Sequence, residues 1–167
     1  MTPPELHRPV RVSRIPPEGM EIVVEANETE RQALAARMGL PAIPALRGRF
    51  VLTRQGNGVV AAAGRLEAVV VQTCVVSLEE FDSSLVEDFA VHFVPEGTES
   101  DDPDPESVDE IPYAGDTIDL GEATAEQLAL TLDPYPRRPD ATLPEADAAT
   151  DPRLAALAAW RDAKTRQ

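Results

Sequence analysis

The chain has few aromatic residues and one cysteine, and it lacks any long apolar run. Aromatic residues make up 4% of the 167 positions, so Val, Leu, Ile and Ala must supply most of any core. The single cysteine, Cys74, excludes an internal disulfide framework. No apolar run approaches the roughly eighteen residues of a membrane-spanning helix. Residues 1–20 also lack the apolar centre of a signal peptide. We therefore expect no membrane association and a cytoplasmic location.

Charge is distributed unevenly along the chain. The net charge at pH 7 is −15. Residues 1–65 contribute nine Arg and six Glu, a balance of +3, and residues 66–167 contribute six basic and 24 acidic residues, a balance of −18. An acidic protein repels bulk nucleic acid, although a local arginine cluster can still contact phosphate. The arginines of the first part are therefore the candidates for RNA contact.

Apolar periodicity predicts a sheet with one helix after its first strand. Alternating residues indicate strands over residues 20–26, 46–53, 59–76 and 85–94. Asn27 followed by Glu30 predicts a helix that ends at Met38, before a Gly39 cap. The fold class that follows is α+β, with a curled antiparallel sheet or partial barrel.

Two glycine positions shape the expected strands. Asn57-Gly58 favours a tight hairpin between the second and third strands, because both residues accept positive φ angles. The third strand is long for a straight strand, and we expect a bulge or bend at Gly64.

Two acidic segments are expected to be mobile. Residues 96–110 contain eight acidic residues and two prolines, too little apolar area to offset the entropy of ordering. We expect one domain over residues 1–139 with this mobile loop inside it. We expect residues 140–167 to form a flexible tail, in which the positions of Pro152 and Trp160 would suit a short helix.

The segment 113–139 combines turn, cap and helix signals. Ile118–Leu120 is predicted to be extended, and Gly121 permits a turn. Thr124 and Gln127 have the spacing of a capping box, and Pro134 ends the short helix that follows. These features indicate a docking element that packs its leucines onto the sheet.

The order of residues in this segment resembles the YceD-like family, known as the large ribosomal RNA subunit accumulation proteins. A central segment is also similar, except that Ser77 stands where the family carries the second cysteine of a Cys-x-x-Cys pair. The positions that carry the resemblance are Cys74, Tyr113, Gly115, Asp116, Asp119, Leu120, Gly121, Glu122 and Gln127.

Two interpretations of Cys74 are open: it is a metal-binding or redox thiol, or it is a small buried apolar residue. A zinc site needs several suitably spaced ligands, and Ser77 removes the nearest one. The apolar neighbours of Cys74 favour burial. We therefore predict no metal.

No pattern of catalytic residues is present. The sequence contains no Gly-x-Ser-x-Gly nucleophile motif, and Gly56-Asn57-Gly58 lacks the Gly-Lys-Ser signature of a phosphate loop. For Asp116 and Asp119, turn and cap chemistry is expected rather than acid–base catalysis. The chain is therefore expected not to be an enzyme, and neither a cofactor nor a small-molecule substrate is predicted.

Four arginines around the predicted hairpin are the candidate RNA contacts. Positions equidistant from the turn oppose each other, which places Arg65 near Arg49. The alternative is that the arginines pair with acidic residues of the same sheet. No aromatic residue shares their strand face for base stacking, because Phe50 is expected to point to the opposite side. The four are Arg47, Arg49, Arg54 and Arg65.

The resemblance implies a non-enzymatic factor in large ribosomal subunit biogenesis that supports accumulation of 23S rRNA. Its expected partner is large-subunit rRNA or its precursor, or a basic ribosomal protein. The alternative is an acidic adaptor that captures a basic protein without contacting RNA.

Overall fold

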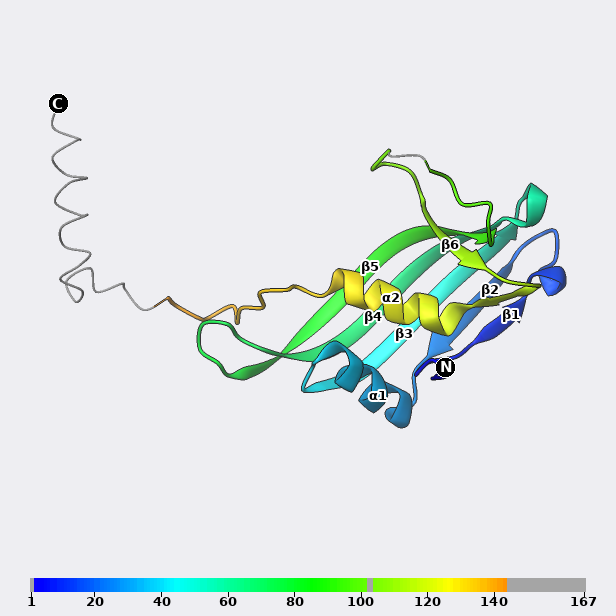
Figure 1. The fold of residues 1–167 in the computed structure, drawn as a ribbon. Helices are drawn as coiled ribbons and strands as arrows, with labels where there is room; N and C mark the ends of the chain where they lie inside the picture. Colours follow the sequence, from blue (N-terminus) through cyan, green and yellow to red (C-terminus); the bar gives the residue numbers. More distant parts are fainter. Residues whose placement is uncertain (1, 102–103, 144–167) are drawn as a thin grey trace, which may run out of the picture.

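The computed structural model describes residues 2–101 and 104–143, and its main element is a five-stranded sheet (Figure 1). The strand order is β2-β3-β4-β5-β6. The strands are β2 (Met20–Glu25), β3 (Ala42–Arg54), β4 (Val60–Thr73), β5 (Glu80–Pro95) and β6 (Asp109–Tyr113). A second sheet pairs β1 (Pro9–Arg11) with β7 (Thr117–Asp119).

The large sheet is open and mixed. All its neighbouring strands are antiparallel except β5 and β6, which are parallel. β2 and β6 occupy the two ends of the strand order and do not pair with each other, so the sheet is not closed. The α+β class predicted from the sequence stands. The predicted partial barrel is not formed, and the prediction of purely antiparallel pairing is wrong at β6.

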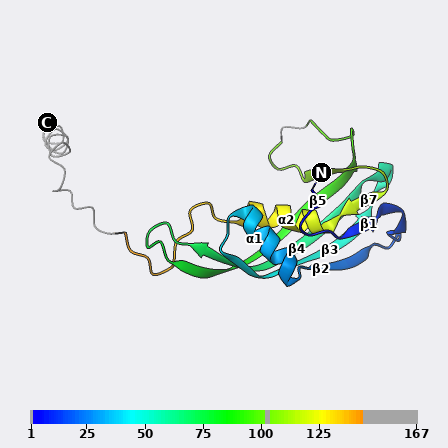
Figure 2. The ribbon, with the colours of Figure 1, turned by 60° about the horizontal axis from the view of Figure 1, so that its bottom comes forward.

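Both helices lie on the same side of the sheet (Figure 2). They are α1 (Glu28–Met38) and α2 (Leu120–Thr131). The side chains below them, including Phe50, Leu52 and Leu66, are fully buried and form the core. Because side chains alternate along a strand, the intervening residues point away from the helices. The sheet thus has one covered face and one open face.

The boundaries of α1 are those predicted from the sequence. Asn27 accepts a hydrogen bond from the Glu30 backbone N–H, and the Glu30 carboxylate accepts one from the Asn27 N–H. Gly39, with φ of 65°, provides the C-cap. The reciprocal capping box explains why the helix begins where it does.

The hairpin between β3 and β4 follows the predicted register, but Gly64 has a different role from the one expected. Asn57 and Gly58 have positive φ angles of 63° and 79°. Pairing continues without a shift through Gly64, so no bulge occurs there. A Cβ at this position would lie 2.2 Å from Cζ of Phe89. Gly64 is needed because the aromatic ring of the neighbouring strand lies directly over it.

The start of α2 corrects the capping prediction. Asp119, not Thr124, is the N-cap residue, and its carboxylate accepts hydrogen bonds from the N–H groups of Gly121 and Glu122. Leu120 is helical rather than extended. The Thr124 hydroxyl is buried inside the helix and donates to the Leu120 carbonyl oxygen at 2.7 Å. The Asp119 carboxylate also accepts a hydrogen bond from the Arg8 N–H, so the N-cap residue is tied to the N-terminal segment.

The two segments expected to be mobile are described only in part. Residues 109 and 110 of the acidic segment belong to β6 rather than to a loop. Most of the predicted tail, including its possible helix at residues 151–163, lies outside the described residues. No helix in the described part of the chain has the length and apolar character needed to cross a bilayer.

Candidate interaction surface

One face of the large sheet is covered by no helix or strand in the part of the chain that the structure describes. Its apolar members include Val23, Val51 and Val86, whose exposed fractions are 41%, 46% and 56%. The face includes Glu21, Val23 and Glu25 of β2, Arg47, Arg49 and Val51 of β3, Ala63, Arg65 and Glu67 of β4, and Asp82, Val86 and Asp88 of β5. We call this set the open face.

Three of the four predicted RNA-contacting arginines meet on this face. Arg49 and Arg65 are cross-strand neighbours, as predicted. Arg47, Arg49, Arg65 and Glu67 line a shallow pocket between β3 and β4. Arg54, at the end of β3, opposes Val60 across the hairpin. The structure therefore brings Arg47, Arg49 and Arg65 together and leaves Arg54 apart from them.

Ion pairs already occupy two of these arginines. Arg65 lies 2.9 Å from Asp88 and 3.5 Å from Glu67, and Arg49 lies 3.4 Å from Glu21. Hydrogen bonding to Asp88 raises the pKa of Arg65. Arg47 and Arg54 form no ion pair with any residue that the structure describes. Two of the four predicted arginines, Arg49 and Arg65, therefore pair with acidic residues of the same sheet, which is the alternative to RNA contact given above.

The electrostatic character of the open face is acidic. Among its twelve defining residues, three are arginines and five are acidic. The arginines are confined to β3 and β4, whereas the charged members on β2 and β5 are acidic only. The face therefore presents a narrow basic stripe between two acidic margins, a pattern that favours a positively charged partner along the margins.

Cys74 is fully buried, which agrees with its predicted burial. Its Sγ accepts hydrogen bonds from the backbone N–H groups of Ser77 and Arg138, each at 3.4 Å. The Ser77 hydroxyl and N–H, together with the Arg138 N–H, lower the pKa of the Cys74 thiol to about 6. The Val75 N–H donates to the Pro136 carbonyl oxygen nearby. The sulfur thus helps to join the loop after β4 to the segment that leaves α2.

No metal centre is formed by the side chains that the structure describes. Within residues 2–101 and 104–143, no three His, Cys, Asp or Glu side chains are grouped closely enough to hold an ion. Nothing in this part of the chain therefore supports a hydrolytic metal site.

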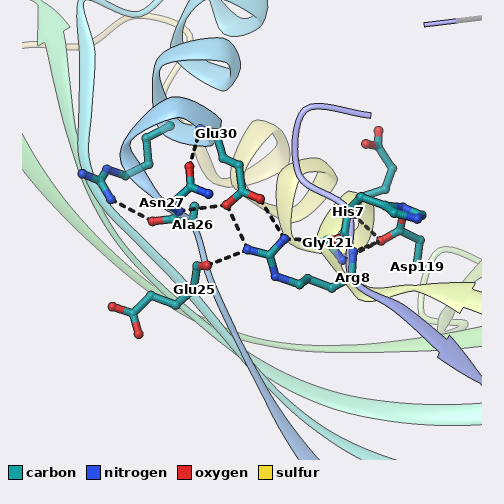
Figure 3. Close-up of polar contacts among 10 residues, drawn as sticks. His7, Arg8, Glu25, Ala26, Asn27, Glu30, Asp119 and Gly121 are labelled. Carbon is teal, nitrogen blue, oxygen red and sulfur yellow. Dashed lines mark hydrogen bonds and ion pairs between the residues drawn. The ribbon is translucent and has the colours of Figure 1, made fainter. Parts of the chain in front are cut away.

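Asp119 and Gly121 join the N-terminal segment to α2 (Figure 3). The Asp119 carboxylate accepts hydrogen bonds from the Arg8 backbone N–H at 2.8 Å and from Nδ1 of His7 at 2.5 Å. A Cβ on Gly121 would lie 2.4 Å from the Leu6 carbonyl oxygen. Only glycine lets the backbone of the N-terminal segment approach α2 this closely.

The environment of Asp119 favours its charged form. Partial burial by itself raises its pKa, but hydrogen bonds from Arg8, His7 and Glu122 outweigh that effect and hold the pKa below its usual value. The charge also lies at the N-terminus of α2, where the helix dipole stabilises an anion. Asp119 acts in capping, as the sequence predicted.

Arg8 is a structural residue that sequence reasoning missed. Its guanidinium group donates to both carboxylate oxygens of Glu30, at 2.8 and 2.9 Å, and to the Glu25 carbonyl oxygen at 3.0 Å (Figure 3). Arg8 therefore links the N-terminal segment to β2 and to the capping box of α1. No local sequence signal reveals such a contact, because the partners are 17 and 22 residues away.

Other positions of the resemblance also hold the covered face together. The Tyr113 hydroxyl donates to the Gly58 carbonyl oxygen at 2.5 Å, which fixes β6 against the hairpin. Asp116 accepts hydrogen bonds from the N–H and hydroxyl of Ser13, and these lower its pKa. Gly115 has a φ of 68° in the turn between β6 and β7.

The α2 positions of the resemblance have packing and pairing roles. Leu120 is fully buried, and Glu122 forms an ion pair with Arg37 at 2.9 Å. The Gln127 carbonyl oxygen accepts a hydrogen bond from the Thr131 hydroxyl. None of these groups lies on the open face. The positions that identify the chain are therefore separate from the surface that is available to a partner.

Comparison with known proteins gives one match. Neither the curated proteins nor the solved structures contain a match to this chain. The family model described as "Large ribosomal RNA subunit accumulation protein YceD" matches residues 62–160, which include most of β4 and all of β5, β6, β7 and α2. Because the match covers more than half of the 167 residues, the chain belongs to the YceD family.

Proposed function

We propose that the chain is a non-enzymatic factor in large ribosomal subunit biogenesis that supports the accumulation of 23S rRNA. The observation that carries this proposal is the YceD family match over residues 62–160, because the family is described by its role in large-subunit rRNA accumulation. Ribosome assembly in bacteria places the proposed action in the cytoplasm. The proposal includes no cofactor and no small-molecule substrate.

Within this role, the geometry best supports binding to a basic ribosomal protein through the open face. Its acidic margins complement a positive partner, and its exposed valines supply apolar contact area. Two of the three arginines on the face are already in ion pairs, which weakens their attraction for phosphate. This favours the protein-binding alternative over extensive direct contact with RNA.

Direct contact with rRNA is the second candidate, and Arg47 and Arg54 favour it. Neither forms an ion pair with a described residue, and both lie on or beside the β3–β4 hairpin. Two such groups are enough to position a nucleic-acid backbone but not to specify its sequence.

The role in rRNA accumulation is tested by depletion. Cells depleted of the protein should show a lower ratio of large-subunit to small-subunit rRNA, and expression of the intact chain should restore it. An unchanged ratio after full depletion would refute the proposed role.

The choice of partner is tested by crosslinking in cells. The double variant Arg47→Glu with Arg49→Glu reverses charge on the open face, and Arg11→Glu with Arg14→Glu makes the same change on β1 and the short helical turn after it. If RNA is contacted directly, crosslinked RNA falls only in the first variant. If a basic protein is the partner, the first variant retains that protein and recovers no less RNA than the second.

A further inference from the structure

Strand β5 has a long free edge. It pairs with β4 from Glu80 to Phe93, whereas β6 lies along its other side only from Val91 to Pro95. The outer side of residues 81–90 therefore pairs with no strand in the part of the chain that the structure describes. Figure 1 shows this part of β5 extending beyond β6.

This edge carries backbone groups that are able to bind a further strand. Along an antiparallel strand, every second residue directs its N–H and C=O away from its paired neighbour. A stretch of this length thus presents a row of donors and acceptors, the template used in strand addition. The opposite edge is less suitable, because β2 has six residues and its Glu25 carbonyl oxygen is bound by Arg8.

The negative charge of this edge favours a positively charged partner. Residues 80–90 contain four acidic residues and no basic residue, and of the four only Asp88 pairs with an arginine that the structure describes, Arg65. A second copy of the same edge would bring acid against acid. A basic segment would instead pair favourably, so the charges oppose self-association while they attract a positive chain.

The alternation of β5 predicts the pattern of the bound segment. On the open face, Asp82 and Asp88 flank Val86, and on the other face Leu85 and Phe89 pack partly against the core on either side of the exposed Glu87. A strand added alongside would place alternate residues next to these two rows. Basic side chains on one face and aliphatic side chains on the other would match both.

We propose that the edge of β5 at residues 81–90 binds an extended, positively charged polypeptide segment as an additional strand of the sheet. This inference rests on the proposed function, since it specifies how a basic partner is held. In this arrangement the backbone hydrogen bonds of β5 supply the affinity, and its acidic side chains supply the selectivity for a basic segment.

The test uses the full chain and a labelled synthetic peptide of about ten residues, long enough to span the edge, in which lysine alternates with valine or threonine. Binding is followed by fluorescence anisotropy. The matched control peptide is N-methylated on alternate residues, on the side that would face β5, so that charge and sequence are kept while the donors are lost. We expect N-methylation to weaken binding by about tenfold or more, because several hydrogen bonds are removed.

Variants of the chain separate this edge from general acidity. Glu80→Gln with Asp82→Asn should weaken peptide binding several-fold, roughly as expected for partly exposed charge pairs. Glu99→Gln with Glu106→Gln removes the same charge from the acidic segment and should leave binding unchanged. Amide hydrogen exchange in residues 81–90 should slow when the peptide binds, and exchange in β2 should not change.

Three outcomes would overturn the inference. They are equal binding of the N-methylated peptide, equal loss in both pairs of variants, and amide exchange in residues 81–90 that does not slow when the peptide binds. None of these outcomes depends on the depletion experiment. If the peptide does not bind the β5 edge but depletion still lowers the rRNA ratio, strand addition is refuted and the proposed role in rRNA accumulation is retained.

Discussion

The residues on the two faces of the large sheet differ in how closely the rest of the protein packs against them. On the covered face, Phe50 and Leu66 are fully buried below helices and the N-terminal segment. On the open face, Arg49 and Val51 stand on either side of Phe50 along β3 but contact mainly neighbours on the sheet. The comparison shows that one strand provides stability on one side and surface for a partner on the other.

The largest difference is expected between adjacent residues of β3. Phe50→Ala removes a fully buried ring and should lower the free energy of unfolding by about 3–5 kcal/mol. Val51→Ala, at a position 46% exposed, should cost less than about 1 kcal/mol. Denaturant unfolding of both variants measures the difference. Similar losses would show that the open face is covered in solution.

The next largest effect is expected where the N-terminal segment contacts α2. Gly121→Ala places a methyl group 2.4 Å from the Leu6 carbonyl oxygen, and the required shift should cost about 1–3 kcal/mol. At Gly56 a Cβ meets no atom within 4 Å, so Gly56→Ala should leave stability unchanged or raise it by up to about 1 kcal/mol. Thermal unfolding compares the two. A neutral Gly121→Ala would contradict the close approach.

The Asp119 cap should contribute a pH-dependent part of the stability. Asp119→Ala should lower the free energy of unfolding by about 1–2 kcal/mol at pH 7, whereas Asp82→Ala on the open face should change it by no more than about 0.5 kcal/mol. The folded-state pKa of Asp119 is lowered. Its contribution is therefore complete above the usual carboxyl value of about 3.9 and is lost as the pH falls through the lower folded-state value.

Urea unfolding between neutral and strongly acidic pH tests this assignment. The difference in the free energy of unfolding between the wild type and Asp119→Ala should become smaller as the pH falls. A difference that is the same at every pH would show that the Asp119 charge does not contribute to stability.

The smallest effects are expected from the arginines of the open face. Arg65→Gln removes the exposed ion pairs with Asp88 and Glu67 and should lower stability only slightly, an effect that added salt reduces. Arg47 has no ion pair with a described residue, and Arg47→Gln should leave stability unchanged. Unfolding at low and high salt distinguishes the two. A large loss at Arg47 would assign it a structural role.

Local signals in the sequence predicted several features that the structure has. The Asn27–Glu30 capping box and Gly39 delimit α1, because their hydrogen bonds lie within one turn of the helix. Asn57-Gly58 sets the hairpin register, and that register alone places Arg49 beside Arg65. These predictions succeeded because each depends on residues close in the sequence.

The errors arose where distant segments meet. The N-cap of α2 is Asp119 rather than Thr124, because the Asp119 carboxylate is also bound by Arg8, which is 111 residues away. Gly64 is required by the ring of Phe89 rather than by a bulge. The parallel pairing of β6 depends on the path of the acidic segment, which carries no strand periodicity.

The sequence by itself determined the family, the α+β class, the boundaries of α1 and the low aromatic content of the core. The separation of the sheet into a covered and an open face was decided only by the tertiary structure. The same holds for the ion pairs that occupy Arg49 and Arg65, and for the edge of β5 that pairs with no strand among the described residues. Neighbours along the chain act through local hydrogen bonds and steric preferences, whereas burial, ion pairing and a free strand edge depend on which distant segments come together.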